Sequence, residues 1–364
     1  MQDKMKIGIS HGDINGISYE VIIKTLMDQR ILEICTPVIY GSSKVLAYHR
    51  KVLDIESFTP TGINSPDEAR GNKAYIINCV DENIRVELGK STEVAGIASY
   101  NALKAATQDL ELGKLDALVT GPVNKQNIQH SDFSYKGHTE YFQARFKVKE
   151  VMMLMISDLL KVGLVAGHVP VSALSTFITQ KLIEDKLQIL ARSLLIDFGI
   201  RNPRIAVLGL NPHAGDDGLL GSEEEEVIKP AIEKAKQKGI TALGPFAADG
   251  FFGAGRFSRF DAVLAMYHAQ GLAPFKSLSM ESGVNYTAGL PVVRTSPAHG
   301  TAFELAGKNE AIPTSFRNAL YLAIDVARSR KLYDEIASNP LPVDKSSSGG
   351  RDDSPEDLET QAES

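Results

Sequence analysis

The sequence predicts an α/β protein built around a mainly parallel β-sheet with helices on both of its faces. Short apolar runs alternate along the chain with longer segments of helical periodicity. Such alternation is typical of units in which a helix carries the chain back to start the next parallel strand. The chain has 364 residues, 43% of them apolar and 23% charged, which is ordinary for a globular protein. This length suits about two domains or one large two-lobed unit.

The apolar runs define eight predicted strands, at 5–10, 36–40, 75–79, 116–120, 151–156, 162–166, 205–210 and 262–267. Residues 182–198 predict an amphipathic helix, because their apolar side chains recur at helical spacing and Gly199 suits a helix end.

A second helix is predicted at 222–239, with a possible capping box of Ser222 and Glu225 and a break at Pro230. The glutamates at 223–226 resemble a cation site. We interpret them instead as a helix start, because acidic side chains favour the positive end of the helix dipole.

The net charge of −6 is concentrated at the end of the chain. Residues 344–364 contain seven acidic and two basic side chains, a net charge of −5. Residues 341–364 are rich in Ser, Gly, Pro and acids, so we predict a disordered acidic tail after a two-lobed unit at 1–340. The near-neutral remainder gives no sign of a surface for nucleic acid or membrane.

The two cysteines, Cys35 and Cys79, exclude a disulfide framework and a cysteine metal site. The N-terminus has no apolar segment typical of a signal peptide. The most apolar stretch, 151–169, is interrupted by Asp158 and Lys161, too soon for a membrane span. We therefore expect a cytoplasmic protein.

Three histidines follow directly on predicted strands. His168 follows the run at 162–166, His213 the run at 205–210, and His268 the run at 262–267. Because ligands of parallel sheets bind beyond the carboxyl ends of the strands, these side chains are expected to converge. Neutral imidazole is the commonest metal ligand among side chains, and three such ligands with one open position describe a catalytic metal site. Alternatively, each histidine is a hydrogen-bonded loop residue.

Polar residues also follow the strand at 116–120. "VTGPVNK" presents Asn124 and Lys125 after a Gly-Pro turn, and "GHTE" presents His138 and Thr139. These side chains suit a polar or anionic ligand, although turn chemistry and a helix start near Thr139 explain most of the pattern.

Lys276, Asn285 and Arg294 are placed in loops punctuated by glycine, where charge-assisted hydrogen bonds can hold a phosphate or carboxylate. The alternative is that the two cations are solvated surface charges. The sequence contains neither a Walker motif nor a G-x-G-x-x-G after the first predicted strand. A dinucleotide would therefore need another kind of binding site.

Taken together, "VTGPVNK", "GHTE", "GLNPHAG", "MYHAQGL", "GVNYTAGLPVVRTS" and "HGTAFELAG" resemble the 4-hydroxythreonine-4-phosphate dehydrogenase family of pyridoxal phosphate biosynthesis over residues 5–335. The resemblance implies an isocitrate/isopropylmalate dehydrogenase-like α/β fold, with two lobes around a central cleft, in a homodimer. NAD would be the oxidant, bound without a Rossmann glycine loop.

The resemblance also assigns site residues. His168, His213 and His268 match metal ligands, with zinc, magnesium or cobalt accepted and the site shared across the dimer interface. His138, Thr139, Lys276, Asn285 and Arg294 match substrate-binding positions. The implied reaction oxidises the secondary hydroxyl of 4-phosphohydroxy-L-threonine and decarboxylates the product to 3-amino-2-oxopropyl phosphate. His138 and Asp249 are both candidates for the group that takes the proton.

The opening motif "SHGDINGIS" departs from the family pattern, with His11 and Asn15 in place of the usual small or proline residues. Two later positions also depart from it. Ala269 follows the third metal histidine and Ala298 precedes the later His-Gly-Thr, where the family usually has acids. Two alternatives therefore stay open. The substrate is instead a sugar-acid phosphate such as threonate or erythronate 4-phosphate, or the protein is a catalytically impaired homologue that still binds ligands.

Overall fold

The computed structural model describes residues 4–129 and 132–338. The predicted tail at 341–364 lies outside these residues. One compact unit extends over Met1–Arg330 and contains all the predicted site residues. No helix in the described ranges is long and apolar enough to cross a membrane.

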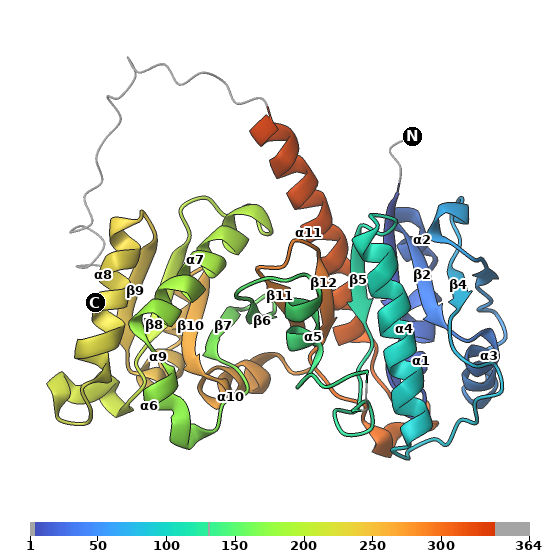
Figure 1. Ribbon diagram of the computed structural model, residues 1–364, viewed down its shortest axis with the longest axis horizontal. Coiled ribbons are helices and arrows are strands. Elements are labelled where there is room, and N and C mark those ends of the chain that lie inside the picture. The colour runs from blue at the N-terminus through green and yellow to red at the C-terminus, as the bar shows by residue number, and fades with distance from the viewer. Residues whose placement is uncertain (1–3, 130–131, 339–364) are drawn as a thin grey trace. The chain divides into compact units, whose positions relative to one another are not determined.

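The described part of the unit is organised around a twelve-stranded sheet, in the order β3-β4-β2-β1-β5-β12-β11-β6-β7-β10-β8-β9 (Figure 1). The strands are β1 Met5–Ser10, β2 Cys35–Gly41, β3 Thr61–Gly62, β4 Tyr75–Asn78, β5 Ala117–Thr120, β6 Met152–Ile156, β7 Lys161–Ala166, β8 Arg204–Leu208, β9 Thr241–Phe246, β10 Ala262–Tyr267, β11 Val284–Ala288 and β12 Arg294–Pro297. Each of the eight predicted strands is present.

The α-helices are α1 Ser18–Leu26, α2 Gln29–Ile34, α3 Ser43–Val52, α4 Glu93–Glu111, α5 His138–Arg145, α6 Leu174–Phe177, α7 Gln180–Ile196, α8 Lys229–Gln237, α9 Ala248–Gly253, α10 His268–Ser279 and α11 Thr314–Ser338. The predicted helix at 182–198 is α7, whose residues Ile183, Leu187 and Leu190 are fully buried. The break predicted at Pro230 is also present, since a π-helical turn at Glu224–Ile228 precedes α8. The predicted capping box is absent, because no side chain caps that turn.

The prediction of a mainly parallel sheet needs a correction at its centre. β11 is antiparallel to both β12 and β6, and β6 is antiparallel to β7. The strands on either side form two parallel blocks, one from β3 to β12 and one from β7 to β9. Because three antiparallel pairings separate them, the two blocks run in opposite directions.

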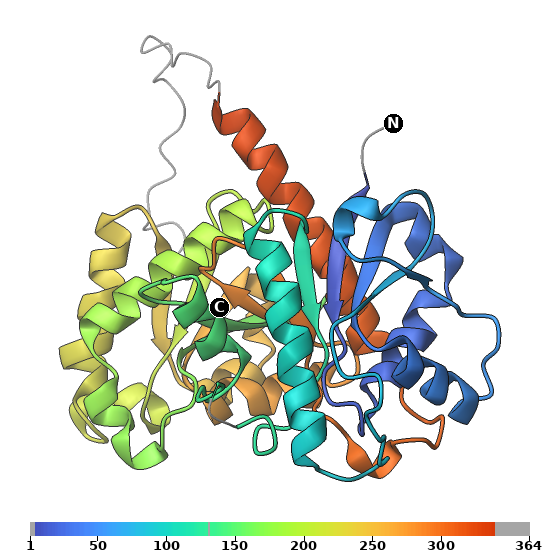
Figure 2. The same ribbon diagram turned by 45° about the vertical axis from the view of Figure 1, so that its right-hand side comes forward.

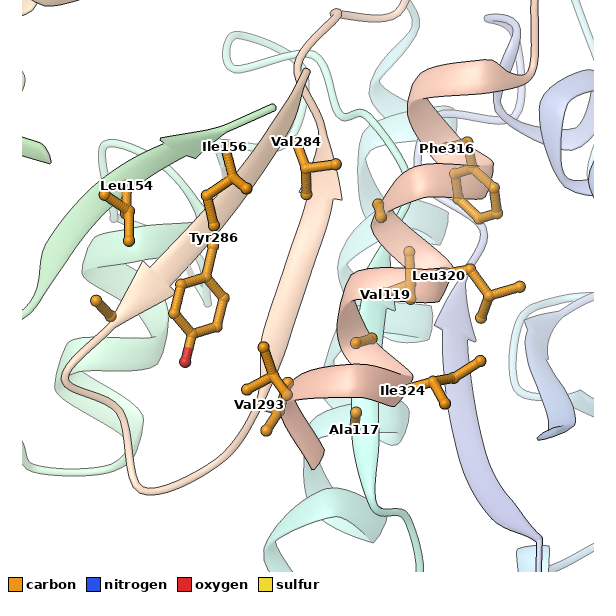
Figure 3. Close-up of a cluster of buried hydrophobic side chains, with 14 of the residues drawn as sticks. Ala117, Val119, Leu154, Ile156, Val284, Tyr286, Val293, Phe316, Leu320 and Ile324 are labelled. Atoms are coloured by element: carbon orange, nitrogen blue, oxygen red, sulfur yellow. The ribbon is translucent and has the colours of Figure 1, made fainter. Parts of the chain in front are cut away.

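Helices cover both faces of the sheet, as predicted. On β5, Leu118 belongs to a buried cluster with Leu103 of α4, whereas Val119 packs in the cluster that contains Phe316 and Leu320 of α11. Alternate residues of a strand face opposite sides, so α4 and α11 lie on opposite faces of β5 (Figure 2). Figure 3 shows the α11 side of this core, where apolar side chains of the central strands and α11 meet. This packing fixes the strands on which the polar site is built.

Candidate active site

A cavity of about 250 Å³ brings together five of the predicted site residues. The full lining comes from the turn after β5, the start of α5, strands β6, β11 and β12, and the loops after β7 and β12. The predicted residues in its lining are His138, Thr139, His168, Asn285 and Arg294. These positions are far apart in sequence, and the central strands bring them to one place.

Arg294 is the deepest charge of this cavity and is 1% exposed. Its Nε and Nη2 donate to Thr120 Oγ1 at 3.1 and 2.6 Å, and Nη1 donates to Thr287 Oγ1 at 3.2 Å. No acidic side chain of the described residues forms an ion pair with it, and burial lowers its pKa to about 9 although Glu140 opposes the shift. A buried cation without a counter-ion is unfavourable unless a ligand supplies the negative charge.

His138 presents a hydrogen-bond donor to the cavity. Its Nδ1 lies 2.9 Å from Arg294 Nη2. Because guanidinium only donates, Nδ1 must accept. Burial, with further contributions from the charges of Arg294 and Lys125, lowers the pKa of His138 well below its usual value. The neutral ring therefore carries its proton on Nε2, which is buried and has no partner among the described residues. The Oδ1 atom of Asn285 is also buried and unpartnered.

His168 is oriented by Glu140, in the first turn of α5. Its Nδ1 lies 3.0 Å from Glu140 Oε1, and its Nε2 lies 3.4 Å from Lys125 Nζ. Burial is the largest influence on Glu140 and favours its protonated form. The hydrogen bond from His168, a backbone hydrogen bond and the charges of His168 and Lys125 together outweigh burial, so the pKa of Glu140 is lowered. A carboxylate that holds one imidazole nitrogen leaves the other free to bind a metal.

The histidine trio is only partly assembled within this chain. The ring centroids of His168 and His268 are 6.1 Å apart, close to the roughly 5–6 Å expected for two imidazoles on one ion. The donor chemistry therefore fits a divalent metal. His213 lies exposed in the loop after β8, and no three acidic, cysteine or histidine side chains in the described ranges are grouped to hold an ion. The three-histidine site therefore stays a prediction. The family resemblance implies that the site is shared across the interface of a homodimer.

Two other predicted residues do not line this cavity. Lys276 is exposed on α10. The pKa of His268 is lowered mainly by burial and then by His168, and the charge of Lys276 makes a smaller contribution. Asp249 is exposed near the start of α9. Of the two later departures from the family pattern, Ala298 lines the cavity, whereas Ala269 is exposed at the start of α10.

The expectation that Lys276, Asn285 and Arg294 lie in loops is wrong. Lys276 lies on helix α10. Asn285 and Arg294 lie on short strands, β11 and β12, where Asn285 pairs with Ser296 and Arg294 pairs with Leu118. Sequence patterns missed these strands because polar side chains that face the cavity replace the usual apolar ones.

Sequence analysis gave no role to Glu140 and considered Lys125 only for an unspecified polar or anionic ligand. Both line the cavity, and both lie in the motifs "VTGPVNK" and "GHTE". Glu140 could have been recognised as a candidate site residue, since it lies only two residues after His138, in the first turn of α5.

The turn that carries Lys125 is closely fitted to α4. The Oδ1 atom of Asn124 accepts from the backbone N–H groups of Gln126 and Asn127, at 2.8 and 3.1 Å. Gly96 of α4 lies directly against this turn, because a Cβ at that position would be 1.8 Å from the carbonyl oxygen of Asn127.

Replacing Gly96 with alanine should therefore lower the free energy of unfolding by about 1–3 kcal/mol, the usual cost of forcing an extra methyl group into a packed site. Urea denaturation measures this value. Gly250→Ala is the matched control, because a Cβ there would have no heavy atom within 4 Å. Equal stability of the two variants would contradict the close packing of α4 against the turn.

The comparisons with known proteins agree with this architecture. Residues 33–323 match the family described as pyridoxal phosphate biosynthetic protein PdxA. The chain is 53% identical to 4-hydroxythreonine-4-phosphate dehydrogenase of Bacteroides thetaiotaomicron, over 93% of each chain. It is 38% identical to D-threonate 4-phosphate dehydrogenase of Cupriavidus necator, over 89% of this chain and 98% of that one.

A solved structure supports the fold. The crystal structure of 4-hydroxythreonine-4-phosphate dehydrogenase from Klebsiella pneumoniae aligns with a TM-score of 0.78 and 31% identity, over 89% of this chain and 100% of that chain. The predicted isocitrate/isopropylmalate dehydrogenase-like α/β fold is confirmed. The chain thus belongs to the pyridoxal phosphate biosynthetic protein PdxA family.

Proposed function

We propose that this protein is an NAD-dependent dehydrogenase that oxidises 4-phosphohydroxy-L-threonine at its secondary hydroxyl, with decarboxylation to 3-amino-2-oxopropyl phosphate. The observation that carries the proposal is the buried, uncompensated Arg294 guanidinium beside the unpartnered Nε2–H of His138. Together they offer positive charge and a donor to an anionic ligand of small size. The names of the relatives support the choice of substrate.

In this proposal Arg294 and Lys125 hold the anionic ends of the substrate by charge-assisted hydrogen bonds. His138 donates its Nε2–H, and Thr139 and Asn285 complete the polar lining. The lone pair of His138 Nδ1 is already used by Arg294, so we assign His138 to substrate binding rather than proton abstraction. Asp249 stays a prediction for that second role.

His168 and His268, with His213, would hold a divalent ion such as zinc, magnesium or cobalt. When bound, the ion would supply Lewis acidity that makes loss of the hydroxyl proton feasible near neutral pH. Glu140 accepts from His168 Nδ1, so the free lone pair of the ring is on Nε2, the atom that would bind the metal. We further propose a homodimer with this site at the interface.

The test is NADH formation with 4-phosphohydroxy-L-threonine, with and without added divalent metal, beside a His213→Ala variant. Metal-dependent turnover that is lost in the variant supports the proposal. Bound metal without turnover on any phosphorylated hydroxy acid contradicts it.

A second candidate substrate is D-threonate 4-phosphate, because a relative of nearly the same length carries that activity in its name. The two substrates differ at C2, where one has an amino group and the other a hydroxyl. Comparing kcat/KM for both, and for erythronate 4-phosphate, decides between them. If all three fail, the Ala269→Asp and Ala298→Asp double variant tests the impaired-homologue alternative, since restored turnover would support it.

Lys125→Met should raise KM by about 10–100-fold, because a hydrogen bond to a charged group contributes about 1.5–3 kcal/mol. The substrate dependence of NADH formation measures the change. Lys136→Met is the matched control, because Lys136 lines only a neighbouring cavity of about 440 Å³. Equal KM values in the two variants would remove Lys125 from the site.

A further inference from the structure

Glu224 is a buried carboxylate that the proposed reaction leaves unexplained. It lies in the π-helical turn before α8 and is 1% exposed. Among the described residues its hydrogen-bond partners are neutral N–H groups, and none forms an ion pair with it. A buried charge of this kind is costly unless several donors compensate for it. Its interpretation as part of a dipole-matched helix start does not explain this burial.

All the donors to Glu224 lie on the segment that leaves β8. Its Oε1 accepts from the backbone N–H groups of Leu210 and Asn211 at 2.7 and 2.8 Å, and its Oε2 accepts from Asn211 Nδ2 at 2.9 Å. These contacts end two residues before His213, so the carboxylate holds the base of the loop that carries it.

The loop also closes around the carboxylate. A Cβ at Gly215 would lie 2.6 Å from Glu224 Oε2, and one at Gly209 would lie 3.1 Å from Oε1. A side chain at Gly215 would therefore displace the Glu224 carboxylate, and the φ of +85° at this position also favours glycine. The two glycines bracket His213 and bring both sides of its loop against one buried side chain.

The backbone between these contacts has an unfavourable conformation. His213, Ala214, Asp216 and Asp217 all have left-handed φ values, between 46° and 53°. Consecutive left-handed residues other than glycine are rare, because Cβ approaches the following carbonyl oxygen. Such a loop needs contacts from outside to keep its shape, and Glu224 supplies three hydrogen bonds at its base, to Leu210 and Asn211.

We propose that Glu224 is a positioning residue, which fixes the loop after β8 and acts on the reaction through His213. This inference rests on the proposed function, because that function gives His213 its role. The carboxylate does not need to touch the substrate.

The first test is hydrogen exchange in the full-length protein, read by mass spectrometry over residues 209–221. In Glu224→Ala the amides of this segment should exchange faster, while β7 and β10 keep the wild-type rate. Glu224→Gln should exchange like the wild type, because the amide oxygen still accepts from Leu210 and Asn211. Glu225→Ala is the matched control, since Glu225 is exposed and pairs with Lys229.

The second test is kinetic. Glu224→Ala should lower kcat/KM by roughly 10–100-fold, the usual loss when a residue that orients a metal ligand is removed. Glu224→Gln should restore it to within a few-fold of the wild type, and Glu225→Ala should leave it unchanged. The double variant Glu224→Ala/His213→Ala should be no slower than His213→Ala alone, because both changes disable the same side chain.

The proposal is overturned if the double variant loses the product of the two single-variant reductions in kcat/KM, because the two residues would then act independently. Unchanged hydrogen exchange at residues 209–221 in Glu224→Ala also overturns it. A loss in Glu224→Ala with full activity in His213→Ala also overturns it. A wild type that turns over no candidate substrate refutes the proposed function instead, and the exchange experiment then decides the anchoring of the loop by itself.

Discussion

Replacing Arg294 with lysine should lower kcat/KM by about 10²–10³-fold, since lysine keeps the charge but loses guanidinium hydrogen bonds, each of which contributes about 1.5–3 kcal/mol when one group is charged. The guanidinium contacts Thr120, Thr287 and His138 at once. An ammonium group is a compact point charge and cannot reproduce this planar arrangement. Because His138 Nδ1 then loses its donor, the tautomer that places a proton on Nε2 is no longer favoured.

Arg330→Lys is the matched control. Arg330 is a partly buried arginine whose charge is balanced within the protein, by Asp197 at 2.7 Å. This control should lower the melting temperature and leave KM unchanged. If Arg294→Lys behaves in the same way, with reduced stability and normal KM, then Arg294 is a structural residue and the substrate-binding assignment is wrong.

The free energy of unfolding should fall steeply between about pH 6.5 and pH 4, because two buried histidines resist protonation. Burial lowers the pKa of His11 and of His49 to about 4. Tyr19 stacks between the two rings, with centroids 5.3 and 5.1 Å away. In the unfolded chain both titrate near 6.5.

The sign follows from proton binding. Between the two pKa values the unfolded chain binds protons that the folded protein excludes, so acid favours unfolding. Each histidine contributes about 3 kcal/mol over this range, at 1.36 kcal/mol per pKa unit. His138 and His299, whose pKa values are also lowered by burial, add in the same direction.

Urea denaturation at several pH values measures this dependence. His49→Gln is the informative variant, because glutamine can still donate to the carbonyl oxygen of Ile14, which His49 Nε2 contacts at 2.8 Å. The variant should show a shallower loss of stability with acid. The same slope in both proteins would contradict the low pKa of His49.

β3 and β9, at the ends of the parallel blocks, were not predicted, and their residues are mostly exposed or half-buried. The sequence predicted seven strands of the blocks, β1, β2, β4, β5, β7, β8 and β10, because these strands are mostly buried and apolar. β11 and β12 were missed for the opposite reason. Arg294 and Asn285 are polar side chains that line a cavity, and Thr287 is a buried hydrogen-bond acceptor for Arg294, so periodicity carries no strand signal there. The antiparallel pairing of β6 with β7 could have been predicted, since only four residues separate the two strands, too few for the crossover that parallel strands need. The pairing of β6 with β11 could not, because these strands are distant in sequence.

The candidate site shows the same division. His138, Thr139, Asn285 and Arg294 were identified from family motifs, and the structure places them in one cavity. Their chemistry, however, depends on contacts that no spacing reveals. The tautomer of His138 is set by a guanidinium 156 residues away in sequence, and the loop of His213 is anchored by a glutamate that the sequence presents as one of four.

The position of β5 has a consequence for how this chain is made. One edge of β5 pairs with β1, which is synthesised before it, but the other edge pairs with β12. Thr120 and its partner Arg294 are 174 residues apart. At the usual rates of translation the ribosome needs about 10–35 s to cover that distance. During this interval a newly made parallel sheet carries an open edge, which is a template for pairing with other chains. The nascent N-terminal half is therefore the segment that most needs protection by chaperones, and the strand that ends its exposure is the one that begins with Arg294.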